Sequence, residues 1–329
     1  MKAIVIERPG EFSLVDAPDP RPGPGEVLVR VRACGVCGTD LHIADGEFAP
    51  TPYPIIPGHE FSGEVAELGA EGGAGLAVGD RVAVDPSLFC GHCHFCRAGR
   101  GNLCENWGAI GDTVDGAFAQ YVSVPARNAY RLPDHVGFSA GALIEPTSCA
   151  VHGMRRLGPV AGEDVLIVGA GTMGLLLLQL LERAGAARVA VVDRSASRCA
   201  VAAALGASET ASSVEALDRS FGVAVDATGV PAAIEAAFGA VRRGGRLLVF
   251  GVAPAEASVA LSPFRIYNDE ITVIGSMAVL FSFDAAVELV ATGTIDTAAL
   301  LSAPLPLAEY GAALERVRRG EGIKTQLTP

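Results

Sequence analysis

The spacing of hydrophobic residues changes once along this chain, near residue 145. Before that point, short apolar runs at residues 26–32, 60–66 and 80–84 alternate with polar residues and lie between glycines and prolines. This pattern is typical of β-strands joined by turns. The first half of the chain is therefore expected to be all-β.

From about residue 164, apolar segments of strand length alternate with segments of helical period. Strands are predicted at residues 165–168, 188–192, 223–226, 246–250 and 271–275, with helices ending at 184 and spanning 196–205 and 231–241. Alternation of this kind predicts a parallel, doubly wound sheet, and so an α/β fold. Two further helices are predicted at 283–292 and 307–319.

Length and charge narrow the classes of function. A chain of 329 residues, 50% of them hydrophobic, is long enough for two domains. Its net charge of −12, with lysine only at Lys2 and Lys324, argues against a nucleic-acid partner. The longest apolar run, 174–181, is far shorter than the roughly 20 residues that cross a bilayer. The N-terminus has no signal-peptide pattern. No membrane partner and a cytoplasmic location are predicted.

Four cysteines follow the spacing C-x2-C-x2-C-x7-C: Cys90, Cys93, Cys96 and Cys104. Short spacings let one segment of chain present successive thiolates to a single ion, and four thiolates complete the shell of a structural zinc ion. His92 and His94, which lie between them, are then expected to be solvated loop residues. Disulfides are the alternative for eight cysteines, but clustered spacing in a reducing compartment favours metal binding.

A glycine-rich turn, G-A-G-T-M-G at 169–174, separates the strand at 165–168 from a helix. With an acidic residue at the end of the next strand, Asp193, this is the context of a nicotinamide-dinucleotide site. The cofactor contacts predicted in the turn are Gly169, Gly171, Met173 and Gly174. Asp193 would accept hydrogen bonds from the ribose 2′-hydroxyl, so NAD is predicted in preference to NADP. Arg194 and Arg198 leave NADP open, because either cation could pair with a phosphate.

Four more residues directly follow later strands of the predicted sheet: Thr228, Gly251, Val252 and Ser276. Ligands of doubly wound sheets bind at the carboxyl ends of the strands. These residues are therefore predicted as further cofactor contacts, although Gly251 could equally be an ordinary turn glycine.

A second set of possible metal ligands lies outside the four cysteines: Cys37, His59, Glu60 and Glu145. Sulfur, nitrogen and carboxylate donors can form an incomplete shell that leaves a coordination position for substrate. Scattered cysteines and histidines also pack in protein cores, and residue spacing alone does not decide between these readings.

Together these segments resemble the zinc-containing medium-chain dehydrogenases, and within them the polyol branch that contains sorbitol and threonine dehydrogenases. The resemblance rests on G-V-C-G-T-D-L-H at 35–42, G-H-E at 58–60, the cysteines at 90–104, E-P-T-S at 145–148, and the glycine turn with Asp193. It implies a GroES-like β-rich catalytic domain at 1–148 and 285–329, with its structural zinc lobe at 90–104. A Rossmann domain at 149–284 would be inserted between those segments.

The resemblance also implies roles for individual residues. Cys37 and His59 become ligands of a catalytic zinc, and Glu60 becomes a third ligand or a close neighbour. Glu145 binds the zinc or its water, and which glutamate touches metal stays open. Two further residues, Thr39 and His42, would relay the alcohol proton, while Asp40 would orient His59.

The implied activity is hydride transfer between a secondary alcohol and NAD, with a polyol, diol or cyclitol as substrate. Ile43 and M-A-V at 277–279 depart from the sorbitol dehydrogenase pattern and disfavour sorbitol. The alternatives are an amino-alcohol dehydrogenase and a non-catalytic module that binds zinc and dinucleotide. A homodimer or homotetramer is expected, with residues 271–275 and 276–281 at the interface.

Overall fold

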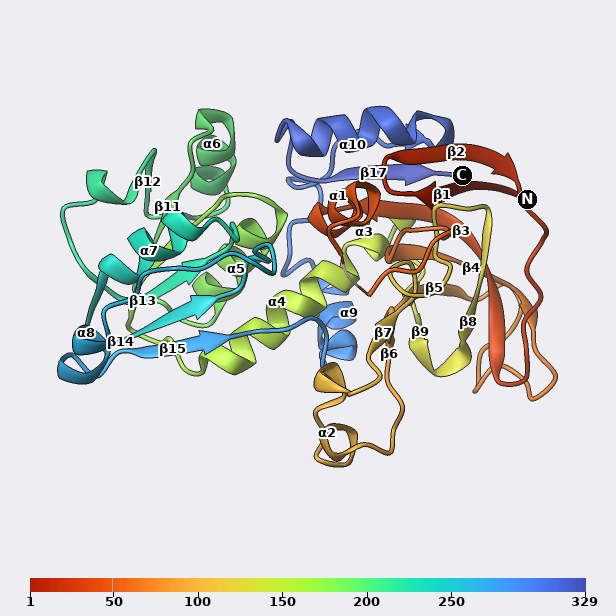
Figure 1. Cartoon of the computed structure of the whole chain (residues 1–329), viewed down its shortest axis with the longest axis horizontal. Coiled ribbons are helices and arrows are strands. Elements are labelled where there is room, and N and C mark those ends of the chain that lie inside the picture. Colours follow the sequence, from red (N-terminus) through yellow and green to blue (C-terminus); the bar gives the residue numbers. More distant parts are fainter. Residues whose placement is uncertain (49) are drawn as a thin grey trace. The chain divides into compact units, whose positions relative to one another are not determined.

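The computed structural model describes residues 1–48 and 50–329, which form two compact units (Figure 1). Unit 1 comprises Met1–Ser148 and Val279–Pro329, and unit 2 comprises Cys149–Ala278. The chain thus returns to unit 1 at Val279, where the sequence suggests residue 285. Helix α4, Ile144–Leu157, carries the first crossing from unit 1 to unit 2.

Unit 1 is built on a seven-stranded sheet of order β16-β17-β3-β4-β5-β9, in which β8 also pairs with β3. Two small sheets, β1-β2 and β6-β7, complete its β-structure. The strands are β1 Lys2–Arg8, β2 Glu11–Asp16, β3 Glu26–Val36, β4 Glu60–Leu68, β5 Arg81–Val84, β6 Ser87–Leu88, β7 Gly108–Ala109, β8 Tyr121–Pro125, β9 Ala129–Arg131, β16 Leu305–Pro306 and β17 Thr325–Thr328. The predicted β-rich architecture of this half is confirmed.

Helices also occur in unit 1, so the expectation that its first half is all-β is wrong. In the first half these are α1 Gly38–Asp45, α2 His94–Arg97 and α3 Phe138–Ala142, with 3-10 turns η1 Gly101–Leu103 and η2 Ala126–Asn128. In the C-terminal segment, α9 Phe283–Ala291 and α10 Tyr310–Arg318, preceded by the 3-10 turn η4 Leu307–Glu309, agree with the two helices predicted there. The first three are short, and a helix of few residues leaves little periodic signal in a sequence.

The C-terminal strand β17 lies antiparallel to β3, with Thr325 opposite Val36 and Leu327 opposite Cys34. This pairing brings the end of the chain beside the segment that leads into Cys37. Buried apolar residues such as Val29, Phe61 and Leu327 form the core beneath these strands. The sheet therefore fixes the position of residues that are distant in sequence.

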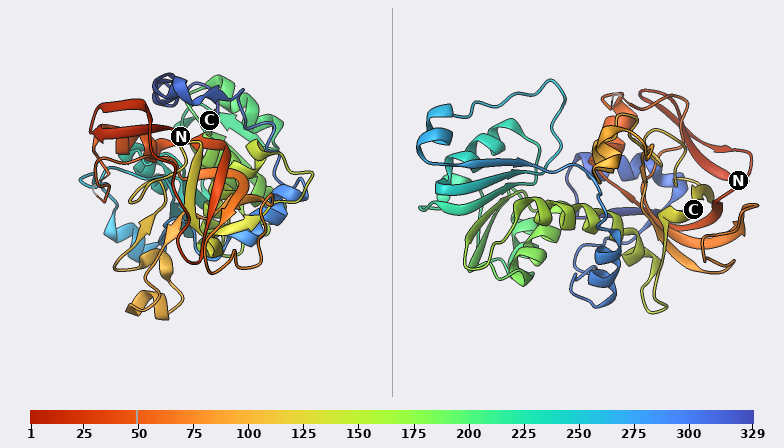
Figure 2. Two further views of the ribbon diagram at one scale, coloured as in Figure 1. Left: turned by 90° about the vertical axis from the view of Figure 1, so that its right-hand side faces the viewer. Right: turned by 90° about the horizontal axis from the view of Figure 1, so that it is seen from below.

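Unit 2 contains a six-stranded parallel sheet of order β12-β11-β10-β13-β14-β15. Its strands are β10 Asp164–Val168, β11 Arg188–Val192, β12 Glu209–Ala211, β13 Phe221–Asp226, β14 Val241–Val249 and β15 Thr272–Gly275; its helices are α5 Thr172–Arg183, α6 Ala196–Ala204, α7 Pro231–Gly239 and α8 Pro263–Asn268, with the 3-10 turn η3 Val214–Ala216. Figure 2 shows helices on both sides of this sheet. The predicted doubly wound parallel sheet is confirmed.

The register of this sheet aligns the carboxyl ends of its strands. Val168 pairs with Val192 on one side and with Asp226 on the other. Asp226 pairs with Val249, which pairs in turn with Gly275. The segments that follow these residues therefore leave the same edge of the sheet.

None of the helices within residues 1–48 and 50–329 has both the length and the apolar character needed to span a membrane.

Candidate functional site

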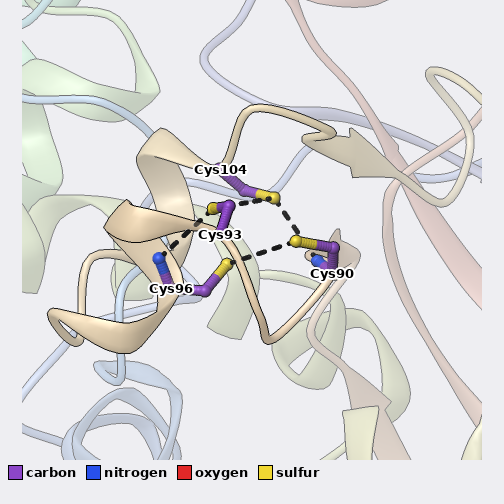
Figure 3. Close-up of side chains that lie close together, drawn as sticks. All are labelled: Cys90, Cys93, Cys96 and Cys104. Atoms are coloured by element: carbon purple, nitrogen blue, oxygen red, sulfur yellow. Dashed lines mark hydrogen bonds between the residues drawn. The ribbon is translucent and has the colours of Figure 1, made fainter.

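The four cysteines of the predicted structural site converge in unit 1 (Figure 3). The Cys90 and Cys96 Sγ atoms lie 4.0 Å apart, and those of Cys93 and Cys104 lie 3.9 Å apart. Sulfurs bound tetrahedrally at 2.3 Å from one zinc ion are separated by about 3.8 Å. The cysteine lobe, residues 90–104, thus has the dimensions of a four-thiolate zinc shell.

Backbone amides of the lobe point at its sulfurs. The amides of Cys90 and Asn106 each donate to Cys104 Sγ at 3.3 Å, and the amide of Cys96 donates to Cys93 Sγ at 3.5 Å. Donation from the His92 amide is the main cause that lowers the pKa of Cys90 to about 6. Amide donors of this kind stabilise thiolates, which are the form that binds zinc.

The ring of His92 also contacts this lobe. Its Nδ1 lies 3.1 Å from Cys90 Sγ. The sequence suggests a solvated loop residue at this position, and the side chain is indeed exposed, but it adds a polar contact to one of the four sulfurs. His94 is exposed as expected and begins α2.

Cys37 and His59 form the centre of the second metal constellation. Cys37 is the N-cap of α1, and His59 immediately precedes β4. The Cys37 Sγ and His59 Nε2 atoms lie 3.1 Å apart, and the His59 side chain is buried. A thiolate and an imidazole nitrogen that converge in this way are a donor set suited to zinc.

Asp40 lies close to both of these residues, and its carboxylate accepts a hydrogen bond from the backbone at the N-terminus of α1. One of its oxygens accepts a hydrogen bond of 2.9 Å from the Cys37 amide, and the other lies 3.8 Å from His59 Nδ1. Burial raises the pKa of Asp40 to about 6. The structure therefore places Asp40 as a residue that holds Cys37 and faces the outer nitrogen of His59.

A carboxylate that the sequence analysis does not identify, Asp112, lies nearer to His59. Its Oδ1 is 2.9 Å from His59 Nδ1, and its side chain is buried. Burial alone would lower the pKa of His59, but Asp112, the Cys37 thiol and Asp40 outweigh it and raise that pKa. A carboxylate at the outer nitrogen directs the other nitrogen toward a metal. No local motif marks Asp112, because the fold alone brings it to His59.

Glu60 forms a buried ion pair with Lys324, which immediately precedes β17. Both side chains are almost inaccessible to solvent. The Cys37, Asp40 and His59 donor atoms all lie within 4.8 Å of one another, and among the described residues Glu60 and Glu145 lie outside this group. The structure thus shows Glu60 with a cation as its partner.

Three other residues predicted for this site also lie in unit 1. Glu145 is buried in the first turn of α4. The Thr39 amide donates to Cys37 Sγ at 3.3 Å, and His42 lies one turn further along α1. Ile43 is fully buried in the core of unit 1. The departure from the sorbitol dehydrogenase pattern at this position is therefore no argument against sorbitol as the substrate.

The glycine turn of unit 2 lies between β10 and α5, as predicted. A side chain at Gly174 would meet the Gly169 carbonyl oxygen at 1.8 Å, and Gly169 itself has φ +104°. Gly171 differs from both, because its φ is −77° and the nearest neighbour of an added Cβ would be Arg198 Nη1 at 4.0 Å. Neither backbone conformation nor packing requires glycine there, and the open space fits the pyrophosphate of a dinucleotide.

Asp193 supports this turn through the backbone. Its Oδ2 accepts a hydrogen bond of 2.8 Å from the Ala170 amide, and its Oδ1 accepts one of 2.8 Å from the Ser195 amide. Each carboxylate oxygen retains a second lone pair that could accept a ribose hydroxyl. Met173 is half-buried in the first turn of α5, and Arg198 near Gly171 is also half-buried.

The remaining predicted cofactor residues lie at the carboxyl edge of the same sheet. The Thr228 hydroxyl donates to Asp226 Oδ1 at 2.6 Å, and an added Cβ at Gly251 would approach the Gly229 nitrogen to 2.0 Å. Val252 is 67% exposed. Ser276 has a buried hydroxyl oxygen without a hydrogen-bond partner in the described part of the chain.

Each of the two units matches the model of a known protein family. A model of the alcohol dehydrogenase GroES-like domain matches residues 23–134, and a model of the zinc-binding dehydrogenase domain matches residues 172–292. D-arabinitol dehydrogenase 1 of Uromyces fabae is 36% identical, over 100% of this chain and 97% of its own length. D-altritol 5-dehydrogenase of Agrobacterium fabrum is 37% identical, over 94% of each chain.

A solved structure agrees over the full length. A protein of Sinorhizobium meliloti 1021, described as a zinc-binding dehydrogenase and bound to NADP, has a TM-score of 0.95 and 36% identity, over 100% of this chain and 99% of its own. The cysteine lobe and the group around Cys37 and His59 are consistent with a structural and a catalytic zinc. Because relatives match along nearly the whole sequence, the chain belongs to the zinc-containing medium-chain alcohol and polyol dehydrogenases, which act on CH–OH groups with NAD(P).

Proposed function

We propose that this protein catalyses the reversible oxidation of a secondary alcohol of the polyol, diol or cyclitol class, with NAD as hydride acceptor. The observation that carries the proposal is the 3.1 Å approach of Cys37 Sγ to His59 Nε2 at the N-terminus of α1. Thr39 and His42 lie on the same helix. One proposed metal ligand, Cys37, and two proposed proton carriers, Thr39 and His42, thus lie in one short segment.

Cys37 and His59 would hold the catalytic zinc, with Glu145 as the proposed carboxylate partner of the metal or its water. When bound, zinc supplies Lewis acidity that makes a coordinated hydroxyl group easier to deprotonate. Asp112 keeps the His59 ring oriented, and Asp40 fixes Cys37 through its backbone amide. The protein residues around the ligands thus preorganise the site before substrate binds.

Thr39 and His42 would move the proton. As the alcohol is oxidised to a ketone, its carbinol hydrogen leaves as hydride and its hydroxyl proton must reach water. The half-buried Thr39 side chain would accept and pass on that proton, and His42 would carry it to the surface. Histidine suits this role because its pKa lies near neutrality in water.

Asp193 supports the proposed preference for NAD. A carboxylate at this position accepts hydrogen bonds from a ribose 2′-hydroxyl and repels a 2′-phosphate. Arg198 is the feature that keeps NADP in consideration, because its guanidinium lies near Gly171. The Sinorhizobium meliloti relative is bound to NADP. Both dinucleotides therefore have to be compared.

The relatives named above support the polyol class, since they act on arabinitol and altritol. An amino alcohol is the second candidate, because threonine dehydrogenases match almost the whole chain at 30% identity. We further propose a homodimer or homotetramer that uses β15 and residues 276–281. We also propose a cytoplasmic location, where two thiol-containing metal sites would stay reduced.

A panel of alditols, diols, cyclitols and amino alcohols, assayed by nicotinamide reduction with NAD and with NADP, tests the proposal. We expect turnover with a polyol-class alcohol and a higher kcat/KM for NAD. A zinc-loaded enzyme that turns over only amino alcohols would favour the second candidate. Absence of turnover across the panel would leave a module that binds zinc and dinucleotide without catalysis.

A further inference from the structure

Glu47 lies against His42 just beyond the end of α1. Its Oε2 is 2.8 Å from His42 Nδ1. His42 belongs to a recognisable motif at 35–42, whereas no sequence motif marks Glu47. The contact therefore adds a residue to the proton path proposed above.

The backbone holds this pair together independently of the side chains. Gly46 ends α1 in the left-handed conformation, with φ 79°, and turns the chain back toward the helix. The Glu47 amide then donates to the His42 carbonyl oxygen at 2.7 Å. This helix C-terminal turn fixes Glu47 beside the ring of His42.

The Glu47 side chain is more exposed to solvent than the His42 side chain, so the pair lies where a proton can be released to water. The His42 side chain is 28% exposed, and the Glu47 side chain is 59% exposed. Ion pairs this close to solvent contribute little to stability. Holding the fold is thus a weak explanation for the pair, whereas orientation of the imidazole is a specific consequence of it.

A carboxylate at Nδ1 determines which ring nitrogen carries the proton. Glutamate accepts a hydrogen bond from Nδ1–H, which leaves the Nε2 lone pair available. We propose that Glu47 is a positioning residue that keeps His42 in this tautomer, so that Nε2 accepts the proton released during alcohol oxidation. The hydride and its electron pair go to the dinucleotide, and the proton passes from His42 to water.

This inference rests on the proposed alcohol oxidation, but its first test does not require turnover. Nitrogen-15 NMR of zinc-loaded protein, at a pH where imidazole is neutral, reports the tautomer of each histidine. His42→Gln identifies the His42 signals among the 6 histidines. We expect the Nδ1–H tautomer at His42 in the wild type and the Nε2–H tautomer in Glu47→Ala. An Nε2–H tautomer in the wild type, or no change in Glu47→Ala, would overturn the proposal.

Kinetics then tests the consequence for proton transfer. Glu47→Ala should lower kcat about tenfold and leave both the alcohol KM and the NADH dissociation constant unchanged, since only proton transfer is affected. Glu47→Asp should restore part of the loss. The matched control is Glu11→Ala, which removes another exposed glutamate of unit 1 that pairs with a cation, Arg8. That control should retain wild-type kcat.

A double variant separates positioning from an independent effect. If Glu47 acts through His42, His42→Gln combined with Glu47→Ala should be no slower than His42→Gln alone. A further tenfold loss in the double variant would contradict the proposal. If the wild type oxidises no alcohol, both the proposed function and this proton relay are refuted. If the wild type is active but His42 keeps the same tautomer in Glu47→Ala, only the proposed role of Glu47 is refuted.

Discussion

Asp112 Oδ1 lies 2.9 Å from His59 Nδ1, closer than the 3.8 Å of Asp40 Oδ1. Both carboxylates face the outer nitrogen of the ring, while the inner nitrogen faces Cys37. The relative distances make Asp112 the principal partner of this imidazole. The Nε2 atom of His59 is thus turned toward Cys37, the side on which a zinc ion would bind.

Asp112→Asn should weaken the catalytic site without removing a metal ligand. Loss of a carboxylate behind a metal-binding histidine typically reduces metal affinity or activity by about 10–100-fold. The measurement is zinc per chain after dialysis against a graded chelator, together with kcat/KM. Asp134→Asn, an exposed acid of the same unit, is the control and should keep full occupancy. Unchanged zinc retention in Asp112→Asn would show that Asp40 suffices.

Lys324 and Glu60 should be strongly coupled. Replacing one partner of a buried ion pair leaves an uncompensated charge and costs about 3–5 kcal/mol of folding free energy. We expect Lys324→Met to lower the urea midpoint of unit 1 clearly. The fluorescence of Trp107, the only tryptophan, follows this transition because Trp107 lies in unit 1.

A second substitution provides the control for that coupling. Glu60→Gln combined with Lys324→Met removes both charges and should recover most of the lost stability, since neither residue is then buried as an unpaired ion. Additive losses in the double variant would mean that the two side chains are not energetically coupled.

Two glycines of the dinucleotide turn should respond differently to alanine. Gly174→Ala forces a Cβ to within 1.8 Å of a backbone oxygen, so unit 2 should be destabilised. At Gly171 an added Cβ finds its nearest neighbour at 4.0 Å, so Gly171→Ala should keep its melting temperature. Its NADH affinity should nevertheless fall about tenfold or more, because the Cβ occupies the space of the pyrophosphate. Titration of NADH fluorescence measures this, and wild-type affinity in Gly171→Ala would argue against the assigned binding mode.

The edge strand β15 should mediate association. Of the described strands only β14 pairs with it, and Val273 on β15 is 42% exposed. A charge on an exposed edge strand opposes pairing with another chain. Val273→Lys should therefore dissociate the oligomer in light scattering, whereas Val78→Lys, at a 63% exposed position of unit 1, should not. A wild-type monomer at micromolar concentration would refute the proposed interface.

The features predicted from sequence are those with short spacing or regular period. The lobe cysteines follow one another within a few turns of chain, and G-A-G-T-M-G lies between a strand and a helix. The parallel sheet is visible because apolar strands alternate with apolar helices. In each case the chemistry and the local structure occupy the same segment.

Contacts between distant segments could not be predicted in this way. Lys324 reaches Glu60 because β17 pairs with β3, which pairs in turn with β4. Asp112 reaches His59 because the segment after it bonds to the backbone just before His59, where the Ala117 amide donates to the Gly58 carbonyl. The bounds of helix α4 are not marked by its hydrophobic period, and Gly153 in its interior weakens the helical signal. Glu47 reaches His42 through a left-handed glycine whose geometry a sequence does not display.

Anomalous scattering at the zinc edge, from crystals of fully metal-loaded protein, tests the central claim most directly. Two ions per chain are predicted: one among the four sulfurs of the cysteine lobe and one bound by Cys37 Sγ and His59 Nε2. A single ion in the lobe, with Cys37 and His59 free of metal, would contradict the proposed catalytic centre.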